Sequence, residues 1–380
     1  MNMEYEIVKY RPEFKQQVVK LQTHLWSPDP ALNRAYLEWK YERNPYMKTP
    51  FIHLALSAGQ VVGMRGMCGA QWQIGCPAQT FLAPCAGDLT IAPDHRNRGL
   101  VAKIMETAVD DLANSGYTYI FNFSAGLATQ LGSLTTGWRS VGSLETAQFC
   151  GLGTRGREYA RPLRFVRGMA NRLLVFLFAR KQPFYFLDSN SAQRHCEAGR
   201  SVHVEQAPRP EAMAELVERI GSDGRMRQVR DQAYFTWRFQ NPLSRYRFFF
   251  WGDTTLEGYL VLRTSVRGKR VSIVDWEATN ITVRADLLQA VLQWGKFDKL
   301  ALWTATLPTE VKTLLHNAGF STVGKIKSIG RAHRTRASRP TVLLRAVRQD
   351  MLKEADWVIA HRRLSDLDNW DLRMIYSDNY

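Results

Sequence analysis

A short aromatic pattern occurs twice in this chain, and it constrains the fold more than any other feature of the sequence. It reads A-Y-x-x-W-[KR]-[YF] and is followed closely by N-P. The first occurrence spans residues 35–41 with Asn44-Pro45, and the second spans residues 233–239 with Asn241-Pro242. Self-similarity at this level indicates a duplicated folding unit rather than coincidence. We therefore expect two related domains in tandem.

The sequence that follows each occurrence also aligns. Each copy continues with a strand-like run, a strand that carries an aspartate, a helix, a second strand and a glycine-aromatic pair. These segments are 53–64, Asp88–Ile91, 101–115, 117–123 and Gly137-Trp138 in the first copy, and 247–262, Asp275–Ala278, 285–294, 300–304 and Gly319-Phe320 in the second. Strands that alternate with helices predict an α/β fold in which each copy has a mixed central sheet flanked by helices.

The alignment divides the chain into four parts. Residues 1–154 and 206–346 form the two copies, 155–205 form a basic connector, and 347–380 form a tail without a counterpart in the first copy. With 380 residues, 45% of them hydrophobic, the chain has enough apolar side chains for two cores. The connector contains a basic, partly amphipathic helical stretch. We expect this stretch either to lie on an anionic membrane surface or to pack against both domains.

The net charge of +16 favours anionic partners. Coenzyme A, nucleic acid and anionic lipid all meet that requirement, but the sequence contains no RNA-recognition motif, so no specific nucleic acid is expected. The five cysteines include no CxxC pair, which argues against a metal site and for reduced thiols. The polar N-terminus and the absence of a long apolar stretch predict a cytoplasmic protein.

One segment of the first copy has the form of an anion-binding site. A strand-like run ends near Pro93, a short basic turn containing Arg96 and Arg98 follows, and a helix begins close to Val101. Free N–H groups at the start of that helix, together with the helix dipole, favour a bound anion, and Gly99 lets the backbone approach it closely. Neither GxxxxGK[ST] nor GxGxxG occurs, so neither a P-loop nor a Rossmann site is supported.

This segment resembles the pyrophosphate loop of the GNAT acetyltransferase superfamily, whose pattern is [QR]-x-x-G-x-[GA] between a strand and a helix. Here the pattern reads Arg96-x-x-Gly99-x-Val101, with Val101 in place of glycine or alanine. The strand and helix expected at 5–25 resemble the start of that family's fold, and Gly137-Trp138 resembles its late Gly-Phe pair. The whole chain is similar to tandem GNAT proteins with a degenerate second copy.

The resemblance implies an acyl-CoA-dependent N-acyltransferase that uses acetyl-CoA or another acyl-CoA as co-substrate. The acyl-pantetheine arm is then expected between two splayed strands, at 88–91 and 117–123, with the pyrophosphate on the helix N-terminus. The residues expected to contact CoA are Leu89, Thr90, Ile91, Arg96, Asn97, Arg98, Gly99, Leu100, Val101, Ala102, Asn122 and Ser124.

The family's reaction is direct attack of a substrate amine on the thioester, which needs a base and is helped by an acid. Asp88 is the first candidate base because of its place on the strand, although the matching Asp275 also allows a purely structural role. Glu145, on the following strand, is the second candidate. Many GNAT enzymes have a tyrosine acid four residues before the Gly-aromatic pair, and here that position is Ser133.

Two other functions stay open at this point. A FemX-like transferase also uses two GNAT-like domains but takes its acyl group from aminoacyl-tRNA, which the positive charge would suit. A non-catalytic tandem module that binds CoA is the other, because the expected tyrosine is absent. The tandem layout also looks like that of GNAT proteins of bacterial surface-polysaccharide pathways. By that analogy we expect a small-molecule amine as acceptor, such as a sugar nucleotide or a lipid-linked sugar.

Overall fold

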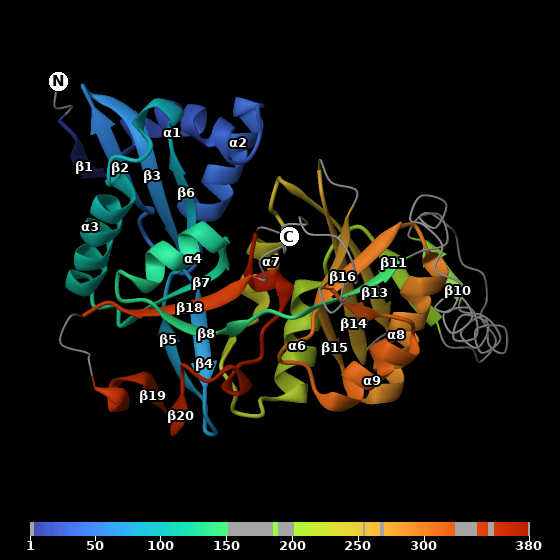
Figure 1. Cartoon of the computed structure of the whole chain (residues 1–380). Coiled ribbons are helices and arrows are strands. Elements are labelled where there is room, and N and C mark those ends of the chain that lie inside the picture. Colours follow the sequence, from blue (N-terminus) through green and yellow to red (C-terminus); the bar gives the residue numbers. More distant parts are fainter. Residues whose placement is uncertain are drawn as a thin grey trace, which may run out of the picture.

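The computed structural model describes residues 4–150, 185–188, 201–253, 255–266, 270–323, 340–348 and 353–378, and it shows two lobes, each built on its own sheet (Figure 1). Apart from residues 185–188 and 201–205, the predicted connector lies outside this part of the chain, and so does its proposed membrane contact. The fold is mixed α/β, as the sequence predicts. Among the described residues, no helix is long and apolar enough to span a bilayer.

The first sheet has seven strands in the order β1-β2-β3-β6-β7-β18-β8. Their bounds are β1 (Glu6–Lys9), β2 (Phe51–Ser57), β3 (Gln60–Cys68), β6 (Cys85–Ile91), β7 (Tyr119–Ala125), β8 (Arg139–Ser143) and β18 (Thr341–Ala346). The helices of this lobe are α1 (Lys15–Leu21), α2 (Pro30–Leu37), α3 (Leu100–Asn114) and α4 (Leu127–Leu134). The helix α2 runs directly into a π-helical turn, Glu38–Glu42, which carries the W-K-Y part of the first aromatic pattern.

The second sheet has eight strands in the order β10-β11-β13-β14-β15-β16-β9-β17. Their bounds are β9 (Thr146–Cys150), β10 (Tyr185–Asp188), β11 (Ser201–Glu205), β13 (Ser244–Trp251), β14 (Gly258–Ser265), β15 (Val271–Ala278), β16 (Lys299–Trp303) and β17 (Ser321–Thr322). The helices of this lobe are α6 (Pro210–Ile220), α7 (Gln232–Arg238), α8 (Ile281–Trp294) and α9 (Thr309–Asn317). A small sheet of β4 (Gln71–Ile74), β5 (Gln79–Leu82) and β12 (Arg227–Gln228) joins the lobes.

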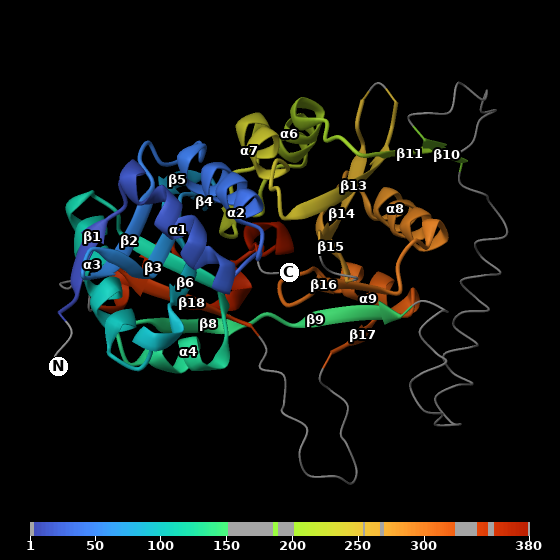
Figure 2. The ribbon, with the colours of Figure 1, turned by 90° about the horizontal axis from the view of Figure 1, so that it is seen from above.

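Each sheet is completed by a strand from the other half of the chain. The strand β18 lies between β7 and β8 and pairs antiparallel with both, although it follows the second copy in sequence. In exchange, β9 leaves the first lobe and pairs antiparallel with β16 and β17 in the second. Figure 2 shows β9 running across from one lobe to the other. The predicted domain boundaries at residues 154 and 206 follow the order of the sequence. In the structure, β9 of the first predicted domain lies in the second sheet, and β18 of the second predicted domain lies in the first sheet.

The two aromatic patterns meet where the lobes join. Trp39 and Trp237 stack with their ring centroids 5.2 Å apart and their planes 12° apart. Each indole Nε1 donates a hydrogen bond of 2.8 Å to the backbone oxygen of the other tryptophan. This reciprocal contact is what a local two-fold axis between duplicated units produces. The aromatic pattern that reveals the duplication in the sequence therefore also forms part of the interface between the copies.

The elements predicted from the sequence occur where the repeat places them. The helix expected at 101–115 is α3, and the strands expected near 117–123 and 300–304 are β7 and β16. The helix expected after the first strand is a shorter α1, flanked by two 3-10 turns, Pro12–Phe14 and Gln22–His24.

Candidate active site

The strands β6 and β7 open a gap in the first sheet. They run parallel and pair at Cys85 and Phe121, and within these two fully described strands the pairing stops there. Across β6, the register against β3 shifts between Met64 and Gly66, and Asp88 takes a positive φ of 46°. Such a bulge takes backbone groups out of the ladder and re-aims a side chain. The splay expected between these strands is confirmed.

A basic loop leads from β6 into α3. It contains a short 3-10 turn, Pro93–His95, and the Arg96 side chain holds the loop closed by donating from Nε to the backbone oxygen of Ile91 at 3.1 Å. Asn97 and Gly99 both have positive φ, 60° and 73°. This alternation turns successive backbone N–H groups toward one side, as anion-binding turns require. Arg98 is exposed, with Nη2 donating to the Asp94 backbone oxygen at 3.2 Å.

The N-terminus of α3 is open. Its cap residue is Gly99, which has no side chain to accept from the first-turn N–H groups. Leu100 is buried beneath the helix, whereas Val101 and Ala102 are exposed on its first turn. The exposure of Val101 explains how a β-branched residue is accommodated at this position. N–H groups without intrahelical partners, at the positive end of a helix dipole, form a site for a phosphate.

The corresponding helix of the second copy provides the internal comparison. The helix α8 begins after Asn280, whose Oδ1 accepts a hydrogen bond of 3.0 Å from the backbone N–H of Val283. The second copy thus caps its own helix, and its strand β15 runs into α8 without a basic loop. Of these two equivalent helices, α3 of the first copy is the one whose N-terminus has no side-chain cap.

The other residues expected to contact CoA lie on the two splayed strands. Leu89, Thr90 and Ile91 form the end of β6, and Thr90 and Ile91 are buried. Asn122 is buried on β7, where its Oδ1 accepts from the backbone N–H of Ser124 at 2.9 Å. This hydrogen bond stabilises the end of β7, so the Asn122 side chain has a structural role there.

Asp88 belongs to a buried ion-pair network at the junction of the copies. Its Oδ1 accepts a hydrogen bond of 2.9 Å from Lys40 Nζ, and Lys40 also pairs with Asp378 at 3.0 Å and donates to Tyr36 at 3.0 Å. Asp378, in the C-terminal tail, pairs in turn with Arg238 at 2.8 Å. Burial lowers the pKa of Lys40, but the carboxylates of Asp88 and Asp378 outweigh it and hold that pKa well above its usual value.

A cavity lies against this network, between the two copies. Its walls come from the π-helical turn, from β6 and β7, from α7 and from the tail. The lining residues include Lys40, Tyr46, Cys68, Cys85, Asp88, Phe123, Ser124, Tyr234, Trp237, Arg238 and Asp378. Glu145 and Ser133 are not among the residues that line it. Glu145 lies between β8 and β9, and Ser133 is half-buried on α4.

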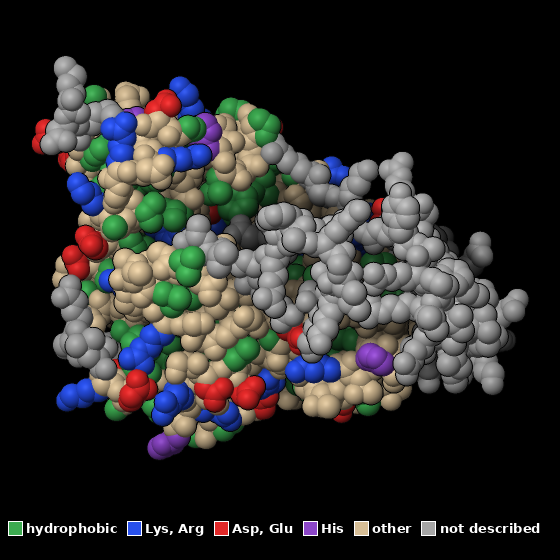
Figure 3. All heavy atoms as spheres, viewed as in Figure 1, with side chains coloured by type: hydrophobic (Ala, Val, Ile, Leu, Met, Phe, Trp, Pro, Cys, Tyr) green, Lys and Arg blue, Asp and Glu red, His purple; other side chains and the backbone are tan. Residues whose placement is uncertain are grey.

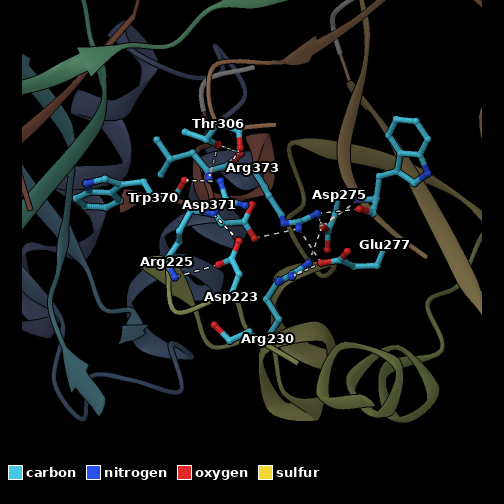
Figure 4. Close-up of polar contacts among 12 residues, drawn as sticks. Asp223, Arg225, Arg230, Asp275, Glu277, Thr306, Trp370, Asp371 and Arg373 are labelled. Atoms are coloured by element: carbon cyan, nitrogen blue, oxygen red, sulfur yellow. Dashed lines mark hydrogen bonds and ion pairs between the residues drawn. The ribbon is translucent and has the colours of Figure 1, made fainter. Parts of the chain in front are cut away.

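The matching position of the second copy is filled by the protein itself. Asp275 accepts from Arg230 at 2.8 Å and from the Tyr259 hydroxyl at 2.8 Å. From the tail, Arg373 pairs with Glu277 at 2.7 Å and donates to the Trp276 backbone oxygen at 2.8 Å (Figure 4).

Trp276 is the residue that corresponds to Leu89. The backbone oxygen that a pantetheine arm would need in the second copy is therefore already occupied. Guanidinium groups neutralise the carboxylates of Asp275 and Glu277. Burial alone would raise the pKa of Glu277, but the positive charges of Arg373 and Arg230 outweigh burial and lower that pKa.

The junction around the cavity contains functional candidates that were not selected from the sequence. Lys40 and Arg238 occupy the same place in the repeated pattern, as do Tyr36 and Tyr234. The repeat itself could have pointed to these residues, because its polar positions lie at the junction of the copies. Asp378 gave no local signal, because only folding of the tail brings it to Lys40.

Comparison with known proteins agrees with this geometry. Residues 6–132 match the family model of an acetyltransferase (GNAT) domain. This stretch of the first copy is thus a GNAT acetyltransferase domain. No curated protein matches it in sequence. In the part of the chain that the structure describes, no group of His, Cys, Asp or Glu side chains is placed to hold a metal ion.

Solved structures share the GNAT fold across both lobes. A GCN5-related N-acetyltransferase from Anabaena variabilis aligns with a TM-score of 0.57 and 13% identity, covering 91% of this chain and 73% of its own. A tandem GNAT protein from the clavulanic acid biosynthesis pathway aligns with a TM-score of 0.53 and 12% identity, covering 90% and 99%. Eis1 from Mycobacterium abscessus aligns with a TM-score of 0.52 and 14% identity, covering 90% and 74%. The tandem GNAT architecture inferred from the repeat is thus confirmed.

Proposed function

We propose that this protein is a cytoplasmic acyl-CoA-dependent N-acyltransferase whose first copy binds the acyl-CoA. The single observation that carries the proposal is the open N-terminus of α3 after the Arg96–Gly99 loop, set against the self-capped N-terminus of α8. The diphosphate of CoA would accept hydrogen bonds from the first-turn N–H groups at Leu100, Val101 and Ala102. The pantetheine arm would pair with the free edge of β6 at Leu89 and Ile91.

The reaction forms a C–N bond and breaks a C–S bond. The amine nitrogen attacks the thioester carbonyl carbon, the carbonyl oxygen takes up negative charge, and CoA leaves as the thiolate. Backbone N–H groups at the β6 bulge are suited to stabilise that oxygen, because the ladder to β3 is interrupted there.

The amine gives up one proton and the thiolate takes one. We assign the first proton to Asp88, whose Oδ1 is held by Lys40 and whose Oδ2 has no hydrogen-bond partner in the described fold. Ser133 is the proposed donor to the thiolate. Glu145 is the alternative base, and its place outside the cavity lining ranks it second.

A charge reversal on the loop tests the proposal. Arg98→Glu places a carboxylate where the diphosphate should bind, and Arg98 is exposed, so the fold should be unaffected. We expect the Kd for acetyl-CoA, measured by calorimetry, to rise at least tenfold, or about 1.4 kcal/mol. Arg245→Glu is the matched control, because it makes the same charge change at an exposed site on β13 of the second copy.

The same preparation distinguishes the other functions. Thermal stabilisation by aminoacyl-tRNA but not by acetyl-CoA would favour a FemX-like transferase. Binding of acetyl-CoA without release of thiol in the presence of any amine would favour a non-catalytic module. Equal acetyl-CoA affinity in Arg98→Glu and in the unmodified protein would overturn the proposed site. The acceptor we propose is a small-molecule amine, with a sugar nucleotide or lipid-linked sugar as the class suggested by analogy.

A further inference from the structure

We propose that the acyl acceptor binds in the cavity between the copies, and that it is a small primary amine which also carries a hydrogen-bonding oxygen. In this arrangement Asp88 of the first copy accepts from the amine, while Tyr234 and Arg238 of the second copy hold the oxygen. The inference rests on the proposed acyltransferase function and assigns an acceptor to that site. It also gives the second copy a role in substrate recognition, although that copy binds no CoA.

The first support is a set of buried polar atoms that have no partners and belong to residues lining the cavity. In the described fold, no hydrogen bond reaches Asp88 Oδ2, the hydroxyls of Tyr46 and Tyr234, or Arg238 Nη1, and all four residues line the cavity. Tyr234, Arg238 and Asp88 are only 1%, 4% and 5% exposed. An unsatisfied buried polar group destabilises the fold, and such groups gathered around one cavity point to a ligand that satisfies them.

The second support is the way these residues are held in place. The guanidinium of Arg238 donates from Nε to the Ile375 backbone oxygen at 2.7 Å and from Nη2 to the Ser377 backbone oxygen at 3.0 Å. It is thereby fixed by the tail, with only Nη1 left for a ligand. Asp88 is fixed in the same way by Lys40. Side chains already held by other contacts lose little entropy when they bind a ligand, which favours recognition.

The arrangement of donors and acceptors defines the chemical class of the ligand. Asp88 offers a carboxylate oxygen beside the gap between β6 and β7, where the thioester is expected, so it accepts from an amine N–H. Arg238 Nη1 is a donor and the tyrosine hydroxyls are donors or acceptors, so together they suit a hydroxyl, ether or anionic oxygen. The rings of Trp237 and Phe123 supply apolar surface for the carbon skeleton between these groups.

Enclosure by both copies favours a small molecule over a protein lysine. Arg238 and Trp237 from α7 form one wall and Ile375 to Asp378 from the tail form another. A lysine side chain carries no oxygen that could accept from Arg238. The carboxylates of Asp88 and Asp378 are already paired with Lys40 and Arg238. No unpaired negative charge is therefore left there to stabilise the protonated form of an entering amine. Burial then lowers its pKa and favours the neutral nucleophile.

Two conservative variants test the inference without disturbing the fold. Tyr234→Phe and Tyr46→Phe each remove only a hydroxyl that has no partner in the described fold, so thermal stability should be unchanged or slightly raised. Tyr246→Phe is the matched control, because its hydroxyl is also buried and unpartnered but lies outside the cavity lining. The probes are two pairs of amines that differ in their oxygens, D-glucosamine with cyclohexylamine and ethanolamine with n-propylamine, together with a short lysine-containing peptide.

We expect the unmodified protein to use at least one hydroxylated amine at least tenfold more efficiently, by kcat/KM, than its oxygen-free partner. Tyr234→Phe should raise the KM for that amine and reduce the preference severalfold, while Tyr246→Phe should leave both unchanged. The Kd for acetyl-CoA should be the same in all four proteins. A thiol-release assay gives the kinetics and calorimetry gives the affinity.

The outcomes separate the two proposals. Three results, each with normal acetyl-CoA binding, would overturn the acceptor inference and leave the proposed acyltransferase function intact. They are the absence of a preference between paired amines, the absence of an effect of Tyr234→Phe, and the lysine peptide as the best acceptor. Normal acetyl-CoA binding without turnover of any probe also counts against the inferred acceptor class. Failure to bind acetyl-CoA overturns the proposed function, and the acceptor inference falls with it.

Discussion

At the scale of single residues, equivalent positions of the two copies hold the same charges with different partners. In the first copy Lys40 pairs with Asp88 of its own lobe as well as with Asp378 of the tail, whereas its equivalent Arg238 is held by the tail, at Asp378. The aspartate of the second copy, Asp275, is held by Arg230 instead. In the described fold, Asp88 of the first copy therefore has one carboxylate oxygen without a partner, whereas both oxygens of Asp275 are bonded in the second copy.

A buried histidine in the first lobe gives a pH prediction. His53 on β2 is 1% exposed, with Nε2 3.3 Å from Asp111 Oδ2 on α3. Burial lowers its pKa to about 4, despite the attraction of Asp111. Since the pKa is depressed in the folded state, the stabilisation is complete above the unfolded value of about 6.5 and is lost as the pH falls toward 4. We expect about 3 kcal/mol to be lost over that interval.

Urea unfolding at pH 7, 5.5 and 4.5 measures this loss. In His53→Gln the free energy of unfolding should vary much less over the same interval, because the glutamine does not titrate. The buried carboxylates do not confound the comparison. The pKa values of Glu277 and Asp378 are lowered by their cationic partners, so their contribution declines only below about pH 4.5. Parallel pH profiles for the two proteins would contradict the assignment.

At the scale of elements, the difference between the copies lies in how two helices begin. Helix α3 starts at a glycine with positive φ after a basic loop, and α8 starts at an asparagine that caps it. The first arrangement leaves the helix N-terminus available to a ligand, and the second satisfies it within the chain. The first copy thus has an open helix N-terminus, where we propose the anion site, and the second has a capped one, although the strands and helices around both are alike.

A carboxylate introduced at each cap tests this contrast. Gly99→Asp puts a negative charge at the open N-terminus, where aspartate tolerates the positive φ, so stability should change by about 1 kcal/mol or less. The Kd for acetyl-CoA should rise at least tenfold, because the carboxylate repels the diphosphate. Asn280→Asp makes the equivalent cap acidic in the second copy and should leave both stability and affinity unchanged. A similar loss of acetyl-CoA affinity in both variants would place the site elsewhere.

At the scale of the whole molecule, the lobes are interlocked. The strands β9 and β18 are exchanged between the sheets, and the largest apolar core extends from Phe121 and Phe123 of the first sheet into the second lobe. The tail adds charges to both copies, with Arg373 bound in one and Asp378 in the other. Among the described residues on the face shown in Figure 3, Lys and Arg side chains are scattered among other residues and form no continuous basic stripe. Buried contacts therefore join the copies, and two independently stable units are not expected.

The interlocking predicts one cooperative unfolding transition. Leu343 on β18 is fully buried in the first lobe, and Leu288 on α8 is 1% exposed in the second. Leu343→Ala and Leu288→Ala should each cost about 2–5 kcal/mol, and each should shift the whole transition to lower temperature in calorimetry. Two resolved transitions, of which each variant moves only one, would show instead that the lobes unfold separately.

The sequence alone identified the duplication, the α/β class and the loop in front of α3, and these are the parts that depend on short-range patterns. Hydrophobic periodicity places helices and strands, and a glycine with neighbouring arginines marks an anion-binding turn within a few residues. The splay between β6 and β7 followed from family resemblance. The roles of the residues expected to bind CoA or to catalyse the reaction stay predictions.

The tertiary structure decided what depends on residues far apart in the chain. Trp39 stacks on Trp237, Lys40 meets Asp378, and β18 enters a sheet whose other strands precede residue 144. None of these contacts leaves a local signal, because each arises from the packing of one copy and the tail against the other. The sequence thus predicted the site that we propose for CoA. The cavity beside Asp88 exists only because folding brings both copies and the tail together.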